Sequence, residues 1–351
     1  MTKSTARRRE DLLDRMVGRP IPRLWCPPLT HYTPEGDIDA QRMRAHWQTM
    51  CEAVGGFLVP GSTGDGWEMT ETEITEVLRT ASDLAVELDT LLLVGVLRTE
   101  VDAMLDVIHR TVRRLKDETG EDEALIAFTQ RHIAGFTICP PQGSDLSQVE
   151  IHRALARVLE LGYPTAVYQL PQVTENEISA TVFRDLATDY PNLILFKDSS
   201  GQDRVALSDE GESGVFLMRG AEGNYARWLR KSGGCYDGLL LSTANCFARE
   251  LGQIITWLEE GRTEDADELS RRLTDVVNAV FATVADLEQG NAFANANKAM
   301  DHFMAHGPDA VEAKSPLLHT GIRLPQDVMH KTKEILERGN LLPADGYLNA
   351  D

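Results

Sequence analysis

The feature that most constrains the fold of this chain is an alternation of short apolar runs with longer stretches of helical periodicity. Eight strand-sized apolar runs span residues 23–26, 56–60, 91–96, 134–139, 165–169, 193–197, 215–218 and 238–241. Strands that alternate with helices form parallel sheets through βαβ crossovers. Eight such units predict a (β/α)8 TIM barrel.

The segments between these runs supply the helices of the predicted barrel. Their apolar residues recur at helical spacing over residues 39–54, 70–88, 100–116, 146–161, 175–188, 202–209 and 224–231, with the weakest pattern in 202–209. An open, doubly wound sheet is the alternative. Such a sheet usually has fewer strands, and no G-x-G-x-x-G pattern follows the first strand here. The closed barrel is therefore favoured.

The strand pattern stops near Phe247, and the rest of the chain is predicted to be a C-terminal helical extension. Its helical segments are residues 250–260, 264–287, 295–306 and 326–338. We therefore expect an N-terminal helical arm (1–20), a (β/α)8 barrel (21–249) and a C-terminal helical domain (250–351). The acidic segment 117–124 (DETGEDEA) predicts a solvated loop or an insertion before the fourth strand.

The N-terminal arm carries three consecutive arginines at residues 7–9, followed by the apolar Leu12, Leu13, Met16 and Val17. It lacks the apolar stretch of a signal peptide. The basic run allows two interpretations: a targeting or nucleic-acid-binding arm, or a short amphipathic helix that packs against the barrel or a neighbouring subunit. We favour the helix.

Charge and cysteine content narrow the classes of partner. The 351 residues carry 55 acidic and 35 basic side chains, a net charge of −20. Nucleic acids bind basic faces, and no apolar run approaches the roughly 20 residues of a membrane span. The five scattered cysteines show no metal-binding spacing and fit a reducing cytoplasm. We expect a cytoplasmic protein that acts on a small molecule, with neither nucleic acid nor membrane as partner.

Two residues at predicted strand ends carry candidate chemistry, because barrel enzymes place catalytic groups at the C-terminal ends of their strands. Lys197 follows the apolar run 193–196, so its amine loses hydration, which favours the neutral form that attacks ketones. The alternative is an ammonium that reaches the rim or pairs with Asp198. Tyr168 ends the fifth strand and offers a phenol that can relay a proton, although a packing role is the simpler interpretation.

A loop of small residues follows the second strand. It consists of Gly61, Ser62, Thr63 and Gly64. Backbone N–H groups can approach an anion closely in such a loop, and the hydroxyls add donors. An ordinary strand-to-helix turn is the alternative, since Thr70 and Glu73 show a capping-box pattern. Together, a carboxylate-binding loop, an amine and a phenol are suited to a 2-oxo acid substrate.

These residues, in this order, resemble the dihydrodipicolinate synthase / N-acetylneuraminate lyase superfamily. The resemblance runs from about Pro27 to Pro325 and rests on residues 61–64, Tyr168-x-x-Pro171, Lys197-Asp198, the segment 238–248 (GLLLSTANCFA) and Arg323-Leu324-Pro325. It implies a (β/α)8 barrel with a C-terminal helical domain, assembled as a homo-oligomer, usually a tetramer. It also implies class I, Schiff-base aldolase or dehydratase chemistry without a metal or cofactor.

The resemblance also assigns roles to residues. Lys197 would be the Schiff-base lysine, Tyr168 the proton relay, and residues 61–64 the cradle for the substrate carboxylate. Leu240 would present its backbone carbonyl to the substrate. The distal part of the substrate would meet Trp67, Gln142, Glu222 and Ser242. The expected substrate is pyruvate or a longer 2-oxo acid, with an aldehyde acceptor if the enzyme is an aldolase.

Three departures from the family pattern argue against a true dihydrodipicolinate synthase. Asp65 stands where the loop commonly ends in glutamate, residues 139–142 (CPPQ) contain no tyrosine, and residues 172–175 (QVTE) contain no arginine. The segment 117–124 looks like an insertion relative to the family, and it would reshape the rim of the site.

Two other classes of function stay open. A metal-dependent barrel enzyme needs His, Asp or Glu ligands at strand ends, whereas His31, His46, His109, His132 and His152 fall mostly on predicted helices or loops. A catalytically silent relative would bind a small acid as a sensor. The missing strand-four tyrosine allows that interpretation, while the presence of both Lys197 and Tyr168 argues against it.

Overall fold

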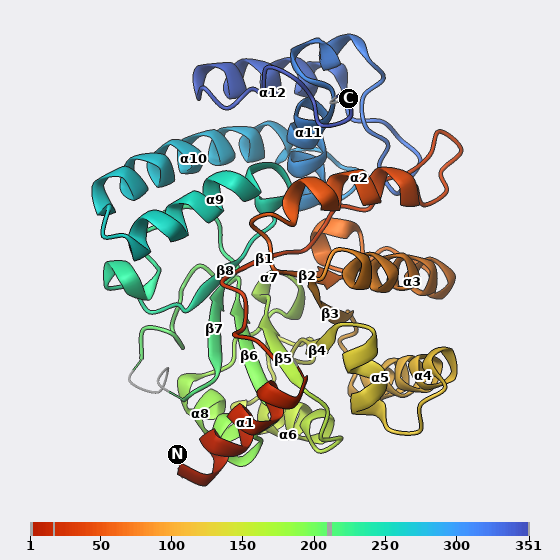
Figure 1. Cartoon of the computed structure of the whole chain (residues 1–351), viewed down its shortest axis with the longest axis vertical. Coiled ribbons are helices and arrows are strands. Elements are labelled where there is room, and N and C mark those ends of the chain that lie inside the picture. Colours follow the sequence, from red (N-terminus) through yellow and green to blue (C-terminus); the bar gives the residue numbers. More distant parts are fainter. Residues whose placement is uncertain (1–2, 17, 209–212, 350–351) are drawn as a thin grey trace.

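In the computed structural model, which describes residues 3–16, 18–208 and 213–349, eight parallel strands close into a barrel (Figure 1). The strands are β1 (Leu24–Cys26), β2 (Gly56–Val59), β3 (Leu91–Val96), β4 (Ile133–Ile138), β5 (Thr165–Gln169), β6 (Leu193–Asp198), β7 (Phe216–Arg219) and β8 (Gly238–Leu240). Each strand pairs with the next, and β1 pairs with β8. The predicted TIM barrel is confirmed.

Helices surround the barrel and continue beyond its last strand. Those between strands are α2 (Ala40–Met50), α3 (Glu71–Glu87), α4 (Val101–Thr119), α5 (Ala124–Gln130), α6 (Gln148–Leu159), α7 (Pro171–Thr174) and α8 (Ala180–Asp189). After β8 come α9 (Ala244–Glu259), α10 (Thr263–Val284), α11 (Ala292–His306) and α12 (Gln326–Arg338). Figure 1 shows α10, α11 and α12 gathered at the end of the molecule opposite α1 (Lys3–Met16). No helix in the described part of the chain is long and apolar enough to cross a membrane.

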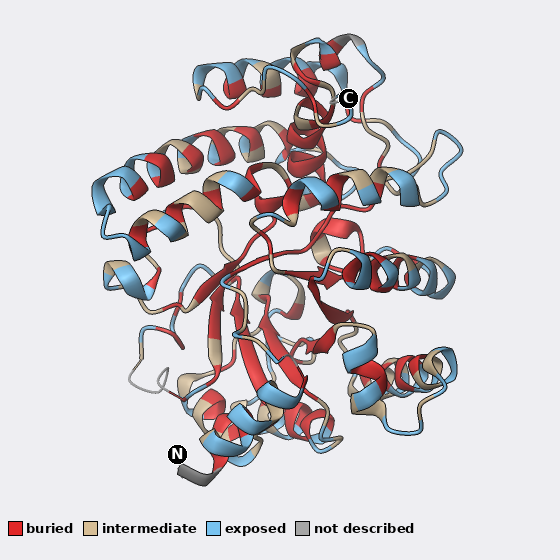
Figure 2. Ribbon diagram, in the orientation of Figure 1, coloured by how far each residue is buried: buried red, intermediate tan, exposed pale blue. Residues whose placement is uncertain are grey.

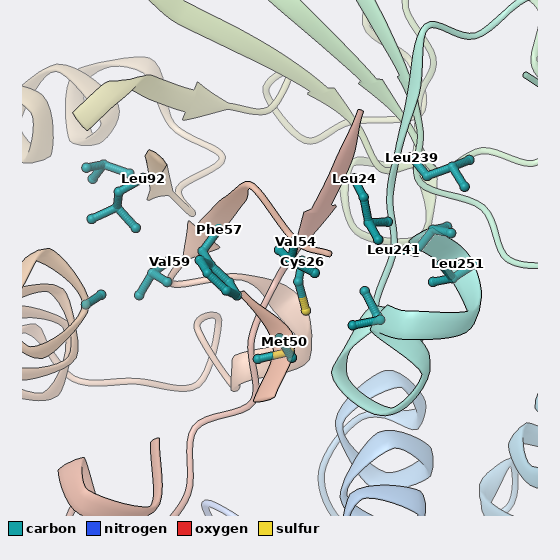
Figure 3. Packing of buried hydrophobic residues seen from close by; sticks show 14 of the residues in the cluster. Leu24, Cys26, Met50, Val54, Phe57, Val59, Leu92, Leu239, Leu241 and Leu251 are labelled. Atoms are coloured by element: carbon teal, nitrogen blue, oxygen red, sulfur yellow. The ribbon is translucent and has the colours of Figure 1, made fainter. Parts of the chain in front are cut away.

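Successive side chains of each strand point alternately into and out of the barrel, which produces two apolar cores. Figure 2 shows that the strands of the barrel are largely buried. The inner core includes Trp25, Leu58, Leu93, Ala166, Met218 and Leu240. The outer core lies between strands and helices, where Leu24, Phe57 and Leu239 meet side chains such as Met50 and Leu251 (Figure 3). Strands buried on both faces read as continuous apolar runs, which explains why the sequence located all eight.

Helix α1 packs against the N-terminal end of the barrel. Arg9 is 1 % exposed, and its guanidinium donates to the carbonyl oxygens of Ala187 at 2.6 Å, Leu193 at 2.6 Å and Ser213 at 3.0 Å. Leu12 and Leu13 pack against the inner core. The favoured interpretation of the arm, a helix packed on the barrel, is confirmed for these residues, while Val17 lies outside the described residues.

The helix predicted over residues 202–209 is wrong. Residues 202–208 form turns, and Asp209 lies outside the described residues. Asp203 adopts a positive φ of 55°, which ends any helical run. Its carboxylate accepts hydrogen bonds from Arg219 at 3.1 Å and from Tyr236 at 2.6 Å. The segment is therefore held by the buried ion pair between Asp203 and Arg219 and does not form the expected helix.

The helix predicted over residues 224–231 is also wrong. Asn224 has a φ of 53°, and Leu229 forms a parallel β-bridge with Tyr236. The segment has only a single turn of 3-10 helix, η3 (Arg230–Ser232). Pairing with the chain ahead of β8 satisfies backbone groups that a helix would have satisfied internally.

The acidic segment 117–124, predicted to be a solvated loop or an insertion before the fourth strand, is a loop only in its middle part and does not lie at the site rim. Helix α4 continues to Thr119, Gly120 caps it in the left-handed conformation, and α5 begins at Ala124. The segment connects a helix to the start of β4, so it lies at the N-terminal end of the barrel. A (β/α)8 barrel builds its site at the opposite end, and the expectation that this segment reshapes the rim is wrong.

Candidate active site

Tyr168 and Lys197 lie side by side at the C-terminal ends of β5 and β6. They are paired in the strand register and are 3 % and 4 % exposed. Lys197 Nζ lies 3.8 Å from the centroid of the Tyr168 ring, within the range of a cation–π contact. The two predicted catalytic residues are therefore in contact.

Lys197 does not pair with Asp198, which was the alternative interpretation of this lysine. In the described part of the chain, no carboxylate lies within ion-pair distance of its Nζ. Asp198 accepts a hydrogen bond from the backbone N–H of Ser200 at 2.9 Å. Burial raises the pKa of Asp198. The amine is thus left available for a ligand.

Gly220 lies directly after β7, and because it has no side chain it leaves room for Lys197. A Cβ on residue 220 would lie 2.8 Å from Cε of Lys197 and would overlap Oγ of Ser199. Contacts under 3.0 Å force one group to move. Because both atoms belong to flexible side chains, a larger residue at 220 would displace the lysine rather than the backbone.

Two buried thiols lie near this amine. Burial raises the pKa of Cys139 to about 12, although Lys197 acts in the opposite direction. Burial also raises the pKa of Cys26, where Glu222 raises it further and Lys197 lowers it. The thiolate is the nucleophilic form of cysteine, so both residues are protonated at neutral pH and do not compete with Lys197.

The predicted carboxylate cradle forms a short 3-10 turn, η1 (Ser62–Gly64), directly after β2. Gly61 caps the turn, so the N–H groups of Ser62 and Thr63 have no acceptor within it. Gly64 is confined: a Cβ there would lie 2.6 Å from the carbonyl oxygen of Pro28. The turn offers donors at the same end of the barrel as Lys197.

Trp67 joins this turn to Tyr168. Its Nε1 donates to Oγ of Ser62 at 2.9 Å. Its ring packs against a small buried cluster made of Cys139, Tyr168 and Leu170. Sequence reasoning expected Trp67 to contact the distal substrate. The structure shows that Trp67 positions Ser62, while its contact with substrate stays a prediction.

Asp65 anchors the end of the turn through partners that sequence reasoning missed. It has a φ of 61°, and its Oδ2 accepts hydrogen bonds from Lys298 Nζ at 2.7 Å and from the Tyr32 hydroxyl at 3.0 Å. Lys298 is buried on α11, 233 residues away in the chain. No local pattern could reveal this pair.

Glu222 and Ser242 lie together, as expected of residues at neighbouring strand ends, but they bond to each other. Ser242 Oγ donates to Glu222 Oε1 at 2.6 Å, and the backbone N–H of Thr243 donates to the same oxygen at 3.1 Å. The hydroxyls of Thr243 and Tyr225 donate to Oε2. Four donors saturate this carboxylate, which indicates a structural role.

Leu240 and Gln142, two further residues predicted to contact the substrate, differ in how deeply they are buried. Leu240 is buried in the inner core at the end of β8. Gln142 is exposed after β4, and its Nε2 donates to Oε1 of Glu175 at 2.9 Å. Gln142 therefore lies on the rim and ties the loop after β4 to the loop after β5.

Among the described residues, one group of three side chains has the spacing of a metal site: His31, His46 and Asp301. His31 Nε2 and His46 Nδ1 lie 3.0 Å apart, and His46 Nε2 lies 2.7 Å from the Asn245 carbonyl oxygen. Arg42 donates to Asp301 at 2.8 Å. A cation here would have to displace these bonds and lie beside a guanidinium, so the group does not suit a metal.

With this geometry in place, the comparisons with known proteins are informative. The sequence profile of the dihydrodipicolinate synthetase family matches residues 127–297, a span that contains Tyr168 and Lys197. A 4-hydroxy-tetrahydrodipicolinate synthase from Chlorobaculum parvum is 23 % identical over 248 residues, covering 70 % of this chain and 77 % of that protein. These matches support membership of the dihydrodipicolinate synthase superfamily, and the low identity fits a divergent member.

Solved structures share the fold of this superfamily member. A prophage protein of the dihydrodipicolinic acid synthase family from E. coli K12, solved in complex with pyruvate, is 15 % identical, with a TM-score of 0.71 over 92 % of this chain and 100 % of that one. A variant of Sulfolobus solfataricus 2-keto-3-deoxygluconate aldolase is 15 % identical, with a TM-score of 0.64 over 91 % and 96 %. The family supports an aldolase or lyase as the broad class of activity.

Proposed function

We propose that this chain is a class I aldolase or dehydratase that forms an imine between Lys197 and C2 of pyruvate or a longer 2-oxo acid. The observation that carries the proposal is the buried Lys197 amine, 3.8 Å from the Tyr168 ring and without a carboxylate partner in the described part of the chain. Superfamily membership supports the same chemistry.

The reaction would begin when the neutral amine of Lys197 adds to the C2 carbonyl and water leaves, giving an imine that takes up one proton from solvent through the Tyr168 phenol. The imine withdraws electrons, so either a C3 proton or the C3–C4 bond can be broken. Loss of the C3 proton gives an enamine, which attacks an aldehyde in the synthetic direction. If C4 carries a hydroxyl group, loss of the C3 proton and of that hydroxyl as water gives a dehydration instead.

Tyr168 and the η1 turn would serve the two polar ends of this intermediate. The Tyr168 phenol would move the proton between the substrate and water. Ser62 and Thr63, with their backbone N–H groups, would hold the substrate carboxylate, since oriented donors stabilise an anion without reorganising. Trp67 positions Ser62 for this purpose.

The rim favours an acceptor without negative charge. Glu175 lies in the segment that contains no arginine, and its carboxylate is held at the rim by Gln142. A second carboxylate on the substrate would be repelled there. We therefore expect an uncharged or hydroxylated aldehyde rather than the acidic aldehyde of a true dihydrodipicolinate synthase.

The proposal includes a cytoplasmic homo-oligomer, a tetramer by resemblance, without cofactor. Light scattering on the purified chain measures the mass of this assembly. A mass of one chain would contradict this part of the proposal.

Exchange of the C3 protons of pyruvate tests the proposal without knowing the second substrate. In deuterium oxide, the enamine takes up deuterium, and the methyl signal of pyruvate disappears from the proton NMR spectrum. We expect exchange with the wild-type chain and none above background with Lys197→Arg, which keeps the charge but removes the nucleophile.

Addition of EDTA separates the imine route from a metal-dependent one. Exchange that persists in EDTA agrees with the proposal, whereas exchange that EDTA abolishes points to a metal enolate. Exchange that continues undiminished in Lys197→Arg would overturn the proposal, and pyruvate binding without any exchange would indicate the silent relative.

A further inference from the structure

A cavity lies outside the barrel, where the loop after β1 and the start of α2 meet α11 and residues 314–323. Its volume is about 420 Å³, within the range of small-molecule sites. The residues that line it include neither Lys197 nor Tyr168 nor Ser62. It is therefore separate from the candidate active site.

The lining of this cavity is basic, although the chain as a whole carries a net charge of −20. Its cationic side chains are Arg42, Lys298, Lys314 and Arg323. Two carboxylates also line it, and both are engaged. Asp39 caps α2 by accepting the backbone N–H of Arg42 at 2.9 Å, and Asp301 accepts hydrogen bonds from Arg42 and Tyr347 at 2.8 and 2.9 Å.

Two of the four cations have protein partners. Arg42 pairs with Asp301, and Lys298 pairs with Asp65 at 2.7 Å. For Lys314 and Arg323, in contrast, no carboxylate of the described residues lies within ion-pair distance. Arg323 uses Nη1 to donate to the Ser315 carbonyl oxygen at 2.6 Å. This bond holds the guanidinium against the wall and leaves its other donors open.

Two histidines lie beside these cations. Burial, together with Arg42 and His302, lowers the pKa of His306 to about 4. Burial also lowers the pKa of His31, which Asp301 raises and Arg42, His46 and Lys298 lower. Both side chains are neutral at neutral pH, when they can accept or donate hydrogen bonds to a ligand.

We propose that this cavity binds a small anion with two or more anionic oxygens, held by Lys314 and Arg323. The planar guanidinium matches a pair of oxygens, and the lysine supplies a second charge from the adjacent wall. A phosphate ester and a dicarboxylate share this chemistry. The binding does not depend on the proposed function, because no residue of the active site takes part.

Calorimetric titration of the full-length protein tests the proposal, with inorganic phosphate and succinate as separate probes in a low-salt chloride buffer. We expect saturable binding of at least one probe. Lys314→Gln/Arg323→Gln should weaken it by at least about tenfold, since the charge-assisted hydrogen bonds from both side chains to the anion are lost. Binding of phosphate alone or succinate alone would identify the anionic group.

A matched control separates a site from general charge effects. Arg79→Gln/Lys333→Gln removes the same charge from α3 and α12, at residues that do not line the cavity, and should bind like the wild type. Thermal unfolding of the unliganded variants checks that they fold.

Two results would overturn the proposal. One is the absence of binding of either probe to the wild-type chain at millimolar concentration. The other is equal affinity in the wild type and in Lys314→Gln/Arg323→Gln, because the anion would then bind elsewhere. Neither result bears on pyruvate exchange at Lys197, so this proposal and the proposed function can fail independently.

Discussion

Lys197 Nζ lies over the face of the Tyr168 ring, 3.8 Å from its centroid, while both side chains are buried at the C-terminal end of the barrel. The contact favours the ammonium form of Lys197, which must lose a proton before the amine attacks a carbonyl carbon. No carboxylate in the described part of the chain pairs with Lys197 Nζ, so the amine is free of a competing ion pair.

Tyr168→Phe separates the ring from the hydroxyl. The ring face should still hold Lys197, so the imine with pyruvate should still form. Proton transfer should slow by about 10²–10⁴-fold, the usual contribution of a general acid or base. The C3 exchange rate measures the transfer, and borohydride trapping measures the imine. Equal loss of both would mean that the hydroxyl acts before imine formation.

Gly220→Ala crowds Lys197 without disturbing the backbone. The new Cβ would lie 2.8 Å from Lys197 Cε, so the amine should shift away from Tyr168. We expect pyruvate exchange to fall by about tenfold or more, since small misplacements of reacting groups are costly. The melting temperature should change little. A large fall in melting temperature with a normal exchange rate would contradict this role for Gly220.

Glu222→Gln tests whether this residue is structural. The carboxylate accepts from Ser242, Thr243 and Tyr225, and an amide nitrogen cannot accept from these donors. We expect a loss of about 1–3 kcal/mol of unfolding free energy, measured by urea denaturation. Unchanged stability together with a raised KM would instead make Glu222 a substrate contact, as the resemblance suggested.

The lowered pKa of His306 predicts that the folded protein loses stability in mild acid. Burial, with Arg42 and His302, lowers its pKa from 6.5 to about 4, so between these values the unfolded chain binds a proton that the folded chain does not. Stability should therefore fall as the pH drops from about 7 to 4. Because His306 is half-buried and its charge is partly screened by solvent, its contribution to this change in unfolding free energy is about 1 kcal/mol.

Urea unfolding at two pH values measures this effect. His306→Gln should reduce the difference in unfolding free energy between pH 7 and pH 4.5. His330→Gln, an exposed histidine on α12, serves as the control and should leave the difference as in the wild type. An unchanged difference in His306→Gln would show that other groups account for the acid sensitivity.

The eight strands could be predicted because each is buried on both faces and therefore reads as an uninterrupted apolar run. Helices with strong periodicity were also found: α3 and α12 match their predicted ranges within one residue. The failures at 202–209 and 224–231 lie in short segments, where Asp203 and Leu229 have partners outside the segment.

The candidate site was predictable to a similar degree. Lys197 and Tyr168 stand at the C-terminal ends of strands and the turn at Ser62 follows one, so their positions at one end of the barrel follow from its topology. The partners that hold them do not follow, because the pairs Lys298–Asp65 and Trp67–Ser62 depend on tertiary packing. The saturation of Glu222 likewise appears only when the loops after β7 and β8 are brought together.

Borohydride trapping tests the central claim most directly. The wild-type protein is incubated with pyruvate, reduced, digested and analysed by peptide mass spectrometry. The account predicts a stable adduct on the peptide that contains Lys197, no adduct on the peptide that contains the buried Lys298, and no adduct in Lys197→Arg. An adduct on another lysine, or none with pyruvate and longer 2-oxo acids, would contradict the imine on Lys197.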